Sequence, residues 1–341
     1  TGLLQERTAA VVVNAAGAWA AQVAAMAGQL LRLRLRRCVQ LRAARPLGVF
    51  GLVARAIDGR QVHLLPVRQS MLIGTTDDDW LGEPDDPQVN LQDVEYLLQA
   101  VAELDPALHQ TPLLDTLVGL RAAEQDWSSD RFSYGARLVD HGLTGASGLL
   151  SVVGGSLASY RAIAELTVDR LCWRLKRTLP CRTHRLPLPG GERQIHVPLL
   201  AESVGLPVEV VRLLVSRQGD RAREVLAGSP GEQEIVCACS GVTAAEIHHV
   251  IRYEWVRDLA ALRRRTELGR GTCHGCRCAG RAAQLIGLEL GLSPRHVRAL
   301  VLQDEGVRYR MQLPVAGGTV SARLAMQRML SLTGRDLEEC S

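Results

Sequence analysis

Five of the nine cysteines lie in two short stretches, and the other four are scattered singly along the chain. The first stretch, "CAC", places Cys237 and Cys239 one residue apart. The second, "CHGCRC", contains Cys273, Cys276 and Cys278. The chain opens without a secretory signal pattern, and clustered cysteines in such a chain are typical of metal ligands rather than of a disulfide framework. The two stretches are therefore predicted to hold a metal group.

The spacing of these cysteines favours a sulfur-bridged iron cluster over structural zinc. Zinc knuckles usually separate their cysteines by roughly two to four residues, whereas Cys237 and Cys239 are separated by one. In an iron–sulfur cluster the irons lie close together and take thiolates from different loops, and four thiolates suffice for a [2Fe–2S] centre. Gly269, Gly271 and Gly275 suit tight turns whose backbone N–H groups point at the sulfurs. A zinc-bound module is the alternative.

The chain before the cysteines combines short strands with helices. Residues 9–28 are interpreted as a strand, a small-residue turn and a helix rather than as a membrane span, because polar residues and glycines interrupt the apolar run. The alternating "LRLRLRR" at 31–37 predicts a half-buried strand with a solvated arginine face. The acidic, proline-containing stretch 76–88 predicts a loop. Residues 90–104 predict an amphipathic helix capped by Asn90.

Composition limits the function classes. A net charge of +4 over 341 residues gives no nucleic-acid footprint. A hydrophobic content of 47% with 22% charged residues is ordinary for a globular protein. We therefore expect no nucleic-acid partner and no transmembrane segment.

The cysteine module resembles the [2Fe–2S] domain named after bacterioferritin-associated ferredoxin. It is most similar to the version at the C-terminus of anaerobic-type, FAD-dependent glycerol-3-phosphate dehydrogenases, because "RRRTELGRGTC" at 263–273 matches their run before the third cysteine. In that branch four residues separate the last two cysteines, which selects Cys278 as the fourth ligand. The free-standing ferredoxins separate them by two, which selects Cys276 as the alternative. The arginines at 263–265 are interpreted as a solvated helix face. Attraction of an acidic redox partner and a raised cluster potential are the other interpretations.

The first half resembles FAD-dependent oxidoreductases of the D-amino-acid oxidase and glycerol-3-phosphate dehydrogenase superfamily. "VVVNAAGAWA" at 11–20 is similar to their strand–turn–helix beside a flat cofactor. "MLIGTTDDDW" at 71–80 and "VGLRAAEQD" at 118–126 resemble their "IGTTD" and "G-x-R-P" segments. "LLSVVGGSLASYR" at 149–161 resembles the "GGK-x-T-T-Y-R" stretch at the flavin. The resemblance covers roughly residues 9–285.

This sequence departs from the family in two ways. No G-x-G-x-x-G occurs, so the phosphate-cradling unit is missing, and the chain is expected to be the C-terminal part of such an enzyme. Either it is a fragment or a separate polypeptide supplies the rest. Ser156 stands in place of the family lysine and Tyr134 in place of a family arginine, whereas Arg121 remains. Paired cations hold a phosphate dianion best, so these changes weaken the expectation of glycerol 3-phosphate as substrate.

The resemblance implies an α/β (α+β) fold: the C-terminal part of a D-amino-acid-oxidase-like FAD-dependent oxidoreductase with an antiparallel substrate-domain sheet, then a helical segment and a small helical [2Fe–2S] domain. The expected parts are the oxidoreductase part, a linker and helical segment, the [2Fe–2S] domain and a tail, at 1–177, 178–232, 233–288 and 289–341. The expected site residues are Arg121 for the substrate's anionic group, Ala16, Gly17, Gly154, Gly155 and Ser156 for the flavin, and Cys237, Cys239, Cys273 and Cys278 (or Cys276) for the cluster.

The expected function is that of a flavin-dependent oxidoreductase of the glycerol-3-phosphate dehydrogenase type. FAD takes two electrons from a small-molecule substrate, and the cluster passes them singly to a redox partner or to a membrane protein that accepts electrons. The expected location is cytoplasmic, with membrane contact only through partner subunits. The alternative is a non-catalytic [2Fe–2S] protein for electron transfer or redox sensing. The presence of a G-x-G-x-x-G encoded directly upstream of Thr1 distinguishes the two.

Overall fold

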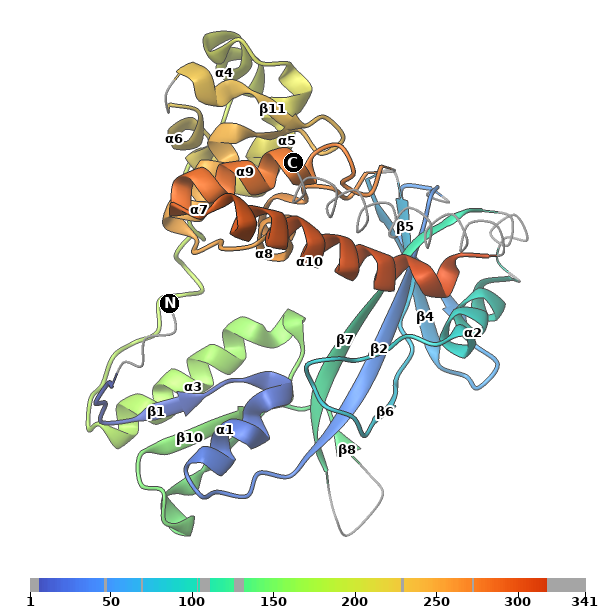
Figure 1. Cartoon of the computed structure of the whole chain (residues 1–341). Coiled ribbons are helices and arrows are strands. Elements are labelled where there is room, and N and C mark those ends of the chain that lie inside the picture. The colour runs from blue at the N-terminus through green and yellow to red at the C-terminus, as the bar shows by residue number, and fades with distance from the viewer. Residues whose placement is uncertain are drawn as a thin grey trace. The chain divides into compact units, whose positions relative to one another are not determined.

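The computed structural model describes residues 6–45, 48–68, 70–102, 104, 111–125, 132–227, 230–271 and 273–317. It divides into two compact units, Thr1–Arg185 and Leu186–Ser341 (Figure 1). No helix in these ranges is both long and apolar enough to cross a bilayer.

The first unit contains a seven-stranded antiparallel sheet in the order β3–β4–β5–β2–β7–β8, with β6 also paired to β2. Its long central strands, β2 and β7, pair from Leu33 opposite Glu124 to Ala43 opposite Leu113 (Figure 1). This pairing confirms the expected antiparallel sheet. The strands are β2 Leu33–Ala43, β3 Leu52–Arg55, β4 Gln61–Val67, β5 Ser70–Gly74, β6 Asp78–Trp80, β7 Leu113–Gln125 and β8 Phe132–Ser133.

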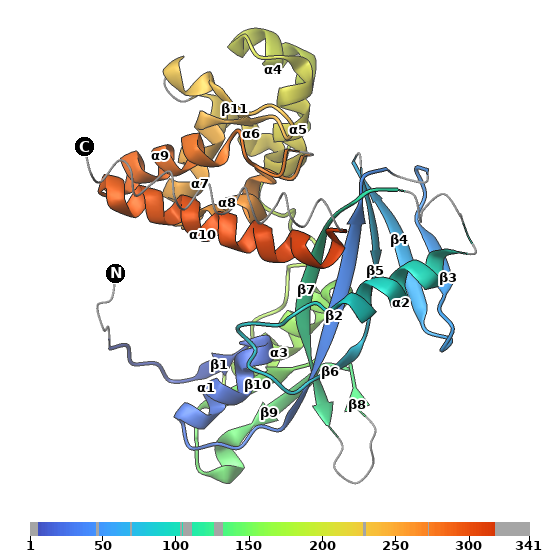
Figure 2. The same cartoon turned by 45° about the vertical axis from the view of Figure 1, so that its right-hand side comes forward.

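One helix, α2 (Leu91–Ala102), packs against β2, β3 and β4 of this sheet (Figure 2). Its Leu97 and Val101 are fully buried, as expected for the apolar face of an amphipathic helix. The Asp93 N–H donates to Asn90 Oδ1 and the Asn90 N–H donates to Asp93 Oδ2, both at 2.9 Å. The predicted helix and its Asn90 cap are thus confirmed.

The arginine-rich part of β2 does not present the solvated face that its alternating pattern predicts. Arg34 Nε lies 2.5 Å from Asp79 Oδ1, and Arg36 Nε lies 3.1 Å from Asp77 Oδ1. Both carboxylates come from the stretch predicted as a loop, of which Asp78–Trp80 forms β6. The Arg34 guanidinium holds the pKa of Asp79 down at about 2. The solvated-face prediction is wrong for Arg34 and Arg36, and the loop prediction is wrong only at Asp78–Trp80, since opposite charges bring these segments together in one sheet.

A three-stranded sheet forms the other part of the first unit. β1 (Val12–Asn14) is parallel to β10 (Leu149–Val153), and β9 (Arg137–Asp140) is antiparallel to β10. β1 leads through a short 3₁₀ turn into α1 (Ala20–Met26), and β10 leads in the same way into α3 (Tyr160–Arg174). The predicted strand–turn–helix at 9–28 is confirmed.

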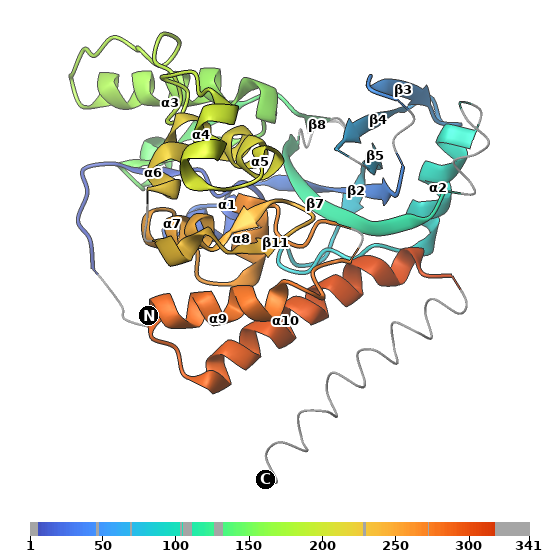
Figure 3. The ribbon, with the colours of Figure 1, turned by 90° about the horizontal axis from the view of Figure 1, so that it is seen from above.

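The second unit is mainly helical (Figure 3). One core joins α4, α5 and α6 to Ala245 of α7, and a second core joins α7, α8, α9 and the β11–β12 hairpin. The helical segment therefore packs against the cysteine module, and the bounds expected at 178–232 and 233–288 stay a prediction. The elements are α4 Val197–Val204, α5 Val208–Gln218, α6 Ala222–Leu226, β11 Ile235–Cys237, β12 Val242–Thr243, α7 Ala244–Tyr253, α8 Leu259–Thr266, α9 Ala279–Leu290 and α10 Pro294–Gln312.

The last of these helices, α10, lies in the expected tail at 289–341. It spans 19 residues, and Ser293 caps it by accepting a hydrogen bond from the His296 N–H. Val297, Leu300 and Val301 pack against the core of the cysteine module, and α10 lies beside α9 (Figure 3). The described part of the tail thus packs against the cysteine module and covers one side of its core.

Candidate functional site

The second unit brings both cysteine stretches together. Cys237 ends β11 and Cys239 lies in the turn after it, while the other stretch lies between α8 and α9. Cys237 and Cys278 are buried, Cys273 is partly buried, and Cys239 and Cys276 are exposed. Thiols from distant parts of the chain therefore meet at the edge of one small core.

The inner pair of thiols is Cys237 and Cys278. The Cys278 thiol donates to the Cys237 sulfur, which also accepts from the backbone N–H groups of Gly269 and Ser240. These donors, the Cys278 thiol first, lower the pKa of Cys237 to about 5. The same hydrogen bond raises the pKa of Cys278. The site thus stabilises a thiolate at Cys237, which is the form that ligates iron.

The outer pair is Cys239 and Cys273, whose thiols are hydrogen-bonded to each other. Burial, followed by the neighbouring Cys273 charge, raises the pKa of Cys239. The two pairs also interact electrostatically, through Cys237 with Cys239 and through Cys273 with Cys278. Each pair takes one cysteine from each stretch.

This arrangement fits a two-iron cluster, in which each iron takes two thiolates. In the described ranges no three His, Cys, Asp or Glu side chains are grouped to hold a metal ion, and the four thiols come together two by two. The fifth thiol, Cys276, is exposed, and its sulfur lies 3.9 Å from Nη1 of Arg308. The geometry therefore pairs Cys278, not Cys276, with the first stretch.

Arg263 supports the loop that carries the second stretch. A Cβ on Gly269 would lie 3.0 Å from its guanidinium, and a Cβ on Gly275 would lie 2.5 Å from its Nη2. Both glycines have positive φ, +74° and +87°. Only glycine lets the loop lie this close to the guanidinium in that conformation. The solvated face predicted at 263–265 is therefore wrong for Arg263.

A buried carboxylate on α10 holds Arg263 in place. Asp304 is 3% exposed, and its Oδ1 lies 2.8 Å from Arg263 Nε. Its Oδ2 accepts from Arg263 Nη2 at 2.9 Å and from Arg308 Nε at 3.0 Å. Arg308 Nη1 donates to the His274 carbonyl at 3.1 Å, between two cysteines. We call Arg263, Asp304 and Arg308 the arginine clamp.

The first unit brings the expected flavin residues to one edge of the three-stranded sheet. β1 and β10 are parallel, with Asn14 opposite Ser151, so their carboxyl ends lie side by side (Figure 1). Gly17 follows β1 with φ +57°, and nothing lies within 4 Å of where its Cβ would be. The expected residues Ala16 and Gly17 therefore lie near Gly154, Gly155 and Ser156, as a shared cofactor edge requires.

The Gly154–Gly155 turn packs tightly on the backbone of the neighbouring segment. The Gly155 N–H donates to the Tyr134 carbonyl at 2.8 Å. A Cβ on Gly154 would lie 2.3 Å from the Gly135 carbonyl oxygen, and φ at Gly154 is +71°. Ser156 caps the next turn, where its N–H donates to Ser159 Oγ at 3.2 Å. The turn thus fixes the position of Tyr134.

Replacing Gly154 with alanine lowers the free energy of unfolding by about 3 kcal/mol, because backbone overlap adds to positive-φ strain. Gly145→Ala is the matched control, since Gly145 also has a positive φ of +100° but has nothing within 4 Å of its Cβ position. The control isolates the strain, which costs about 1 kcal/mol. Denaturant unfolding of both variants measures the difference, and equal losses contradict the close approach.

Arg121 lies in a cluster of charged and aromatic side chains on the large sheet. Its Cζ stacks 3.9 Å from the Tyr134 ring centroid. The Tyr134 hydroxyl donates to the Asp77 carboxylate at 2.6 Å, and Arg36 Nε donates to the same carboxylate at 3.1 Å. Arg121 is exposed and lies opposite Arg36 across β2 and β7. The aromatic residue that replaces a family arginine therefore holds the remaining one by a cation–π contact.

The pKa of Tyr134 is raised to about 12, first by burial and then by its hydrogen bond to Asp77. A raised folded-state pKa means that the neutral phenol contributes stability below pH about 10, which is lost as the pH rises through about 12. Spectrophotometric titration of tyrosinate is expected to show a late phenol that Tyr134→Phe removes. Tyr160→Phe, at a half-exposed ring, is the control and leaves that step in place. A late step that survives in Tyr134→Phe contradicts the assignment.

Comparison with known proteins identifies the family of this chain. A family model described as FAD dependent oxidoreductase matches residues 1–170, and one described as the C-terminal domain of alpha-glycerophosphate oxidase matches 181–297. One subunit of the anaerobic glycerol-3-phosphate dehydrogenase of Escherichia coli K12 is 34% identical over 304 residues, 84% of this chain and 54% of that protein. The chain belongs to the FAD-dependent glycerol-3-phosphate dehydrogenase family.

Other members of this dehydrogenase family give the same result. The corresponding protein of Haemophilus influenzae is 30% identical over 91% of this chain and 56% of its own length. The corresponding protein of Haloferax volcanii is 29% identical over 99% of this chain and 58% of its own length. The chain thus spans a little over half the length of these relatives. None of their names mentions an iron–sulfur cluster.

A solved structure of the same dehydrogenase family confirms the fold. The glycerol-3-phosphate dehydrogenase of Bacillus halodurans, complexed with FAD, superposes with a TM-score of 0.69 at 21% identity, over 89% of this chain and 63% of that one. The predicted fold class, a D-amino-acid-oxidase-like oxidoreductase fold with an antiparallel sheet and a helical C-terminal region, is therefore correct.

Some residues around both sites escaped the sequence prediction. Asp77 and Arg36 join Tyr134 at the Arg121 cluster, and Asp304 and Arg308 complete the arginine clamp. The spacing of Asp304 and Arg308, four residues apart on an expected helix, is a signal for an ion pair. Nothing in the sequence links that pair to Arg263, because Arg263 and Asp304 are 41 positions apart.

Proposed function

We propose that this chain carries the substrate-side residues and a [2Fe–2S] cluster of a flavin-dependent dehydrogenase of the glycerol-3-phosphate type. Electrons leave a small anionic substrate for FAD, pass to the cluster and go singly to a partner protein. The observation that carries the proposal is the meeting of four thiols in two pairs, each with one cysteine from each stretch.

Cys237 and Cys278 would hold one iron of the proposed cluster, and Cys239 and Cys273 would hold the other. A [2Fe–2S] cluster supplies a site that takes up and gives away one electron at a time. The Gly269 and Ser240 N–H groups, which point at the Cys237 sulfur, stabilise negative charge on that ligand. Cys239 is the exposed thiol of these four, so it would be the ligand nearest to solvent.

The first unit supplies the substrate side of the proposed flavin site. The Gly17 turn, with nothing within 4 Å of its Cβ position, leaves room for a flat ring at the edge of the sheet where β1 and β10 end. FAD supplies a two-electron acceptor beside the substrate. Arg121 binds the substrate's anionic group, and the Tyr134 ring holds the guanidinium in position. The names of the relatives make glycerol 3-phosphate the first substrate to test.

One observation favours a second candidate, a non-catalytic [2Fe–2S] electron-transfer protein. Asp77 bonds to Tyr134 directly behind Arg121 and adds negative charge to this cluster. Ser156 brings no charge where the family has lysine. A phosphate dianion is therefore bound less tightly here than between paired cations. In this candidate the chain keeps the cluster and has no substrate of its own.

Anaerobic purification of the chain, followed by iron, sulfide, zinc and flavin analysis, tests the proposal. The expected result is about two irons and two sulfides per chain, with a visible spectrum that dithionite bleaches. Zinc, or no metal, overturns the cluster. Bleaching by glycerol 3-phosphate in the flavin-loaded protein, abolished by Arg121→Ala, separates the dehydrogenase from the electron-transfer protein.

A further inference from the structure

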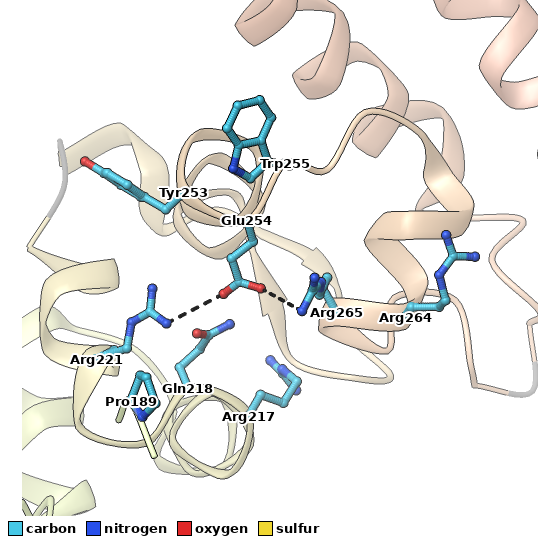
Figure 4. Close-up of a pocket in the computed structure, with 9 residues that line it drawn as sticks. All are labelled: Pro189, Arg217, Gln218, Arg221, Tyr253, Glu254, Trp255, Arg264 and Arg265. Carbon is cyan, nitrogen blue, oxygen red and sulfur yellow. Dashed lines mark ion pairs between the residues drawn. The ribbon is translucent and has the colours of Figure 1, made fainter. Parts of the chain in front are cut away.

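A cavity of about 570 Å³ opens in the second unit (Figure 4). Nothing in the proposed function uses this cavity. It is lined by Pro189, Arg217, Gln218, Arg221, Tyr253, Glu254, Trp255, Arg264 and Arg265. We call it the arginine pocket.

The arginine pocket carries an excess of positive charge. Arg217 is neutralised by the buried Glu246, 2.6 Å away. Glu254 lies 3.9 Å from Arg221 and 3.5 Å from Arg265, so one carboxylate serves two guanidinium groups (Figure 4). Arg264 is exposed and makes no ion pair with any described residue. Two positive charges therefore have no carboxylate of their own, and carboxylates of a ligand fit this site.

Exposed aromatic rings stand at the rim of the arginine pocket. Tyr253 is 68% exposed and Trp255 is 80% exposed, on one side of Glu254 (Figure 4). Arg257 stacks over the Trp255 ring, with its Cζ 5.6 Å from the centroid. Exposed tryptophan, tyrosine and arginine are the residues that dominate protein–protein contacts. Small-molecule sites bury most of their ligand among apolar side chains, whereas this lining is mainly polar and its rim residues Tyr253, Trp255 and Arg264 are exposed, which favours a protein segment.

The arginine pocket is linked to the proposed cluster through Arg217. Its Nη1 donates to the Ser240 carbonyl at 2.8 Å and its Nη2 to the Gly241 carbonyl at 3.2 Å. These carbonyls directly follow Cys239, the exposed thiol of the outer pair. A protein seated on the pocket therefore lies next to the turn that carries the solvent-facing ligand.

We propose that the arginine pocket docks a carboxylate-rich segment of the protein that accepts the electrons of this chain; this rests on the proposed function. Carboxylates of the segment bind Arg264 and Arg265, and an apolar or aromatic side chain packs on Trp255. One electron leaves the reduced cluster past the Cys239 turn and reduces the acceptor by one electron. No covalent bond forms or breaks in that step.

Fluorescence anisotropy of the full chain with a dye-labelled peptide tests the docking directly. The probe is a synthetic peptide with glutamates around one phenylalanine, and its glutamine version is the control. Arg264→Ala/Arg265→Ala is expected to weaken binding at least about fivefold, and Trp255→Ala also weakens it. The matched control, Arg212→Ala/Arg295→Ala, removes two exposed arginines elsewhere on the same unit and leaves binding within about twofold.

The same variants test the electron exit. The chain is reduced with dithionite, and the excess dithionite is removed. The reduced chain is then reoxidised by anionic ferricyanide or by cationic hexaammineruthenium(III). Arg264→Ala/Arg265→Ala is expected to slow reoxidation by ferricyanide about tenfold and to leave the rate of reoxidation by the ruthenium complex unchanged. Equal effects in the Arg212→Ala/Arg295→Ala control overturn the proposal.

The outcomes separate the two proposals. A chain without iron that still binds the peptide through Arg264 and Arg265 overturns the cluster but keeps the docking site. A chain with its cluster that binds the glutamine peptide equally well overturns the docking site alone. Pyrophosphate that binds more tightly than the glutamate peptide also overturns docking, since it identifies a site for small anions.

Discussion

Cys278→Ser abolishes cluster binding, whereas Cys276→Ser leaves it intact. A serine hydroxyl stays protonated where a thiol ionises, so the first variant leaves one iron with a single thiolate, from Cys237. The Cys276 sulfur lies next to Arg308 and outside both thiol pairs. Iron and sulfide analysis is expected to fall from about two of each per chain to near zero in Cys278→Ser alone.

Two controls make this comparison decisive. Cys278 is 2% exposed, so a serine there also buries a hydroxyl. The Gly275 carbonyl, 3.7 Å from the sulfur, is available to accept from it, and circular dichroism is expected to show a folded variant. Cys273→Ser, at a partly buried thiol, is the second control and is expected to lose the cluster in the same way. Loss in Cys276→Ser with retention in Cys278→Ser reverses the ligand assignment.

The sequence alone predicted the parts of this protein whose pattern is local. The strand and helix around residues 11–26 follow from an apolar run interrupted by small residues, and the structure has them where expected. The cap of α2 follows from Asn90 and Asp93, three residues apart. Spacing also singled out the cysteines as a group. In each case the residues that determine the structure lie within a few positions of one another.

The parts that the sequence did not predict depend on contacts between distant residues. Asp79 and Arg34 are 45 positions apart. Their ion pair joins β2 to β6, a short strand inside the stretch expected to be a loop. In the sequence, Arg263 is one of three arginines predicted to be solvated. In the structure, Asp304 of α10 accepts a hydrogen bond from it. In the sequence, Tyr134 stands where the family has a cationic arginine. In the structure, the Tyr134 ring also stacks on Arg121. Alternation and spacing carry no information on such partners.

Asp304→Ala is expected to lower the free energy of unfolding of the second unit by about 3 kcal/mol or more, because it leaves two guanidinium groups partly buried without their carboxylate. Arg263 and Arg308 have side chains only 18% and 14% exposed. The matched control on the same helix is Gln303→Ala, at an exposed position, with an effect within about 0.5 kcal/mol. Denaturant unfolding, followed by far-UV circular dichroism, measures both.

The same variant tests whether the arginine clamp positions the cysteine loop or only stabilises α10. Once Arg263 is released, the loop with Gly269 and Gly275 loses the guanidinium against which it packs. Asp304→Asn keeps the side-chain volume, so its cluster is expected to form and then to lose iron to a chelator about tenfold faster than wild type. Arg308→Ala releases the His274 carbonyl alone and gives an intermediate rate. If Asp304→Asn loses stability but keeps the wild-type rate of iron loss, the clamp supports only the helix, because a loop held by its own glycines does not need the carboxylate.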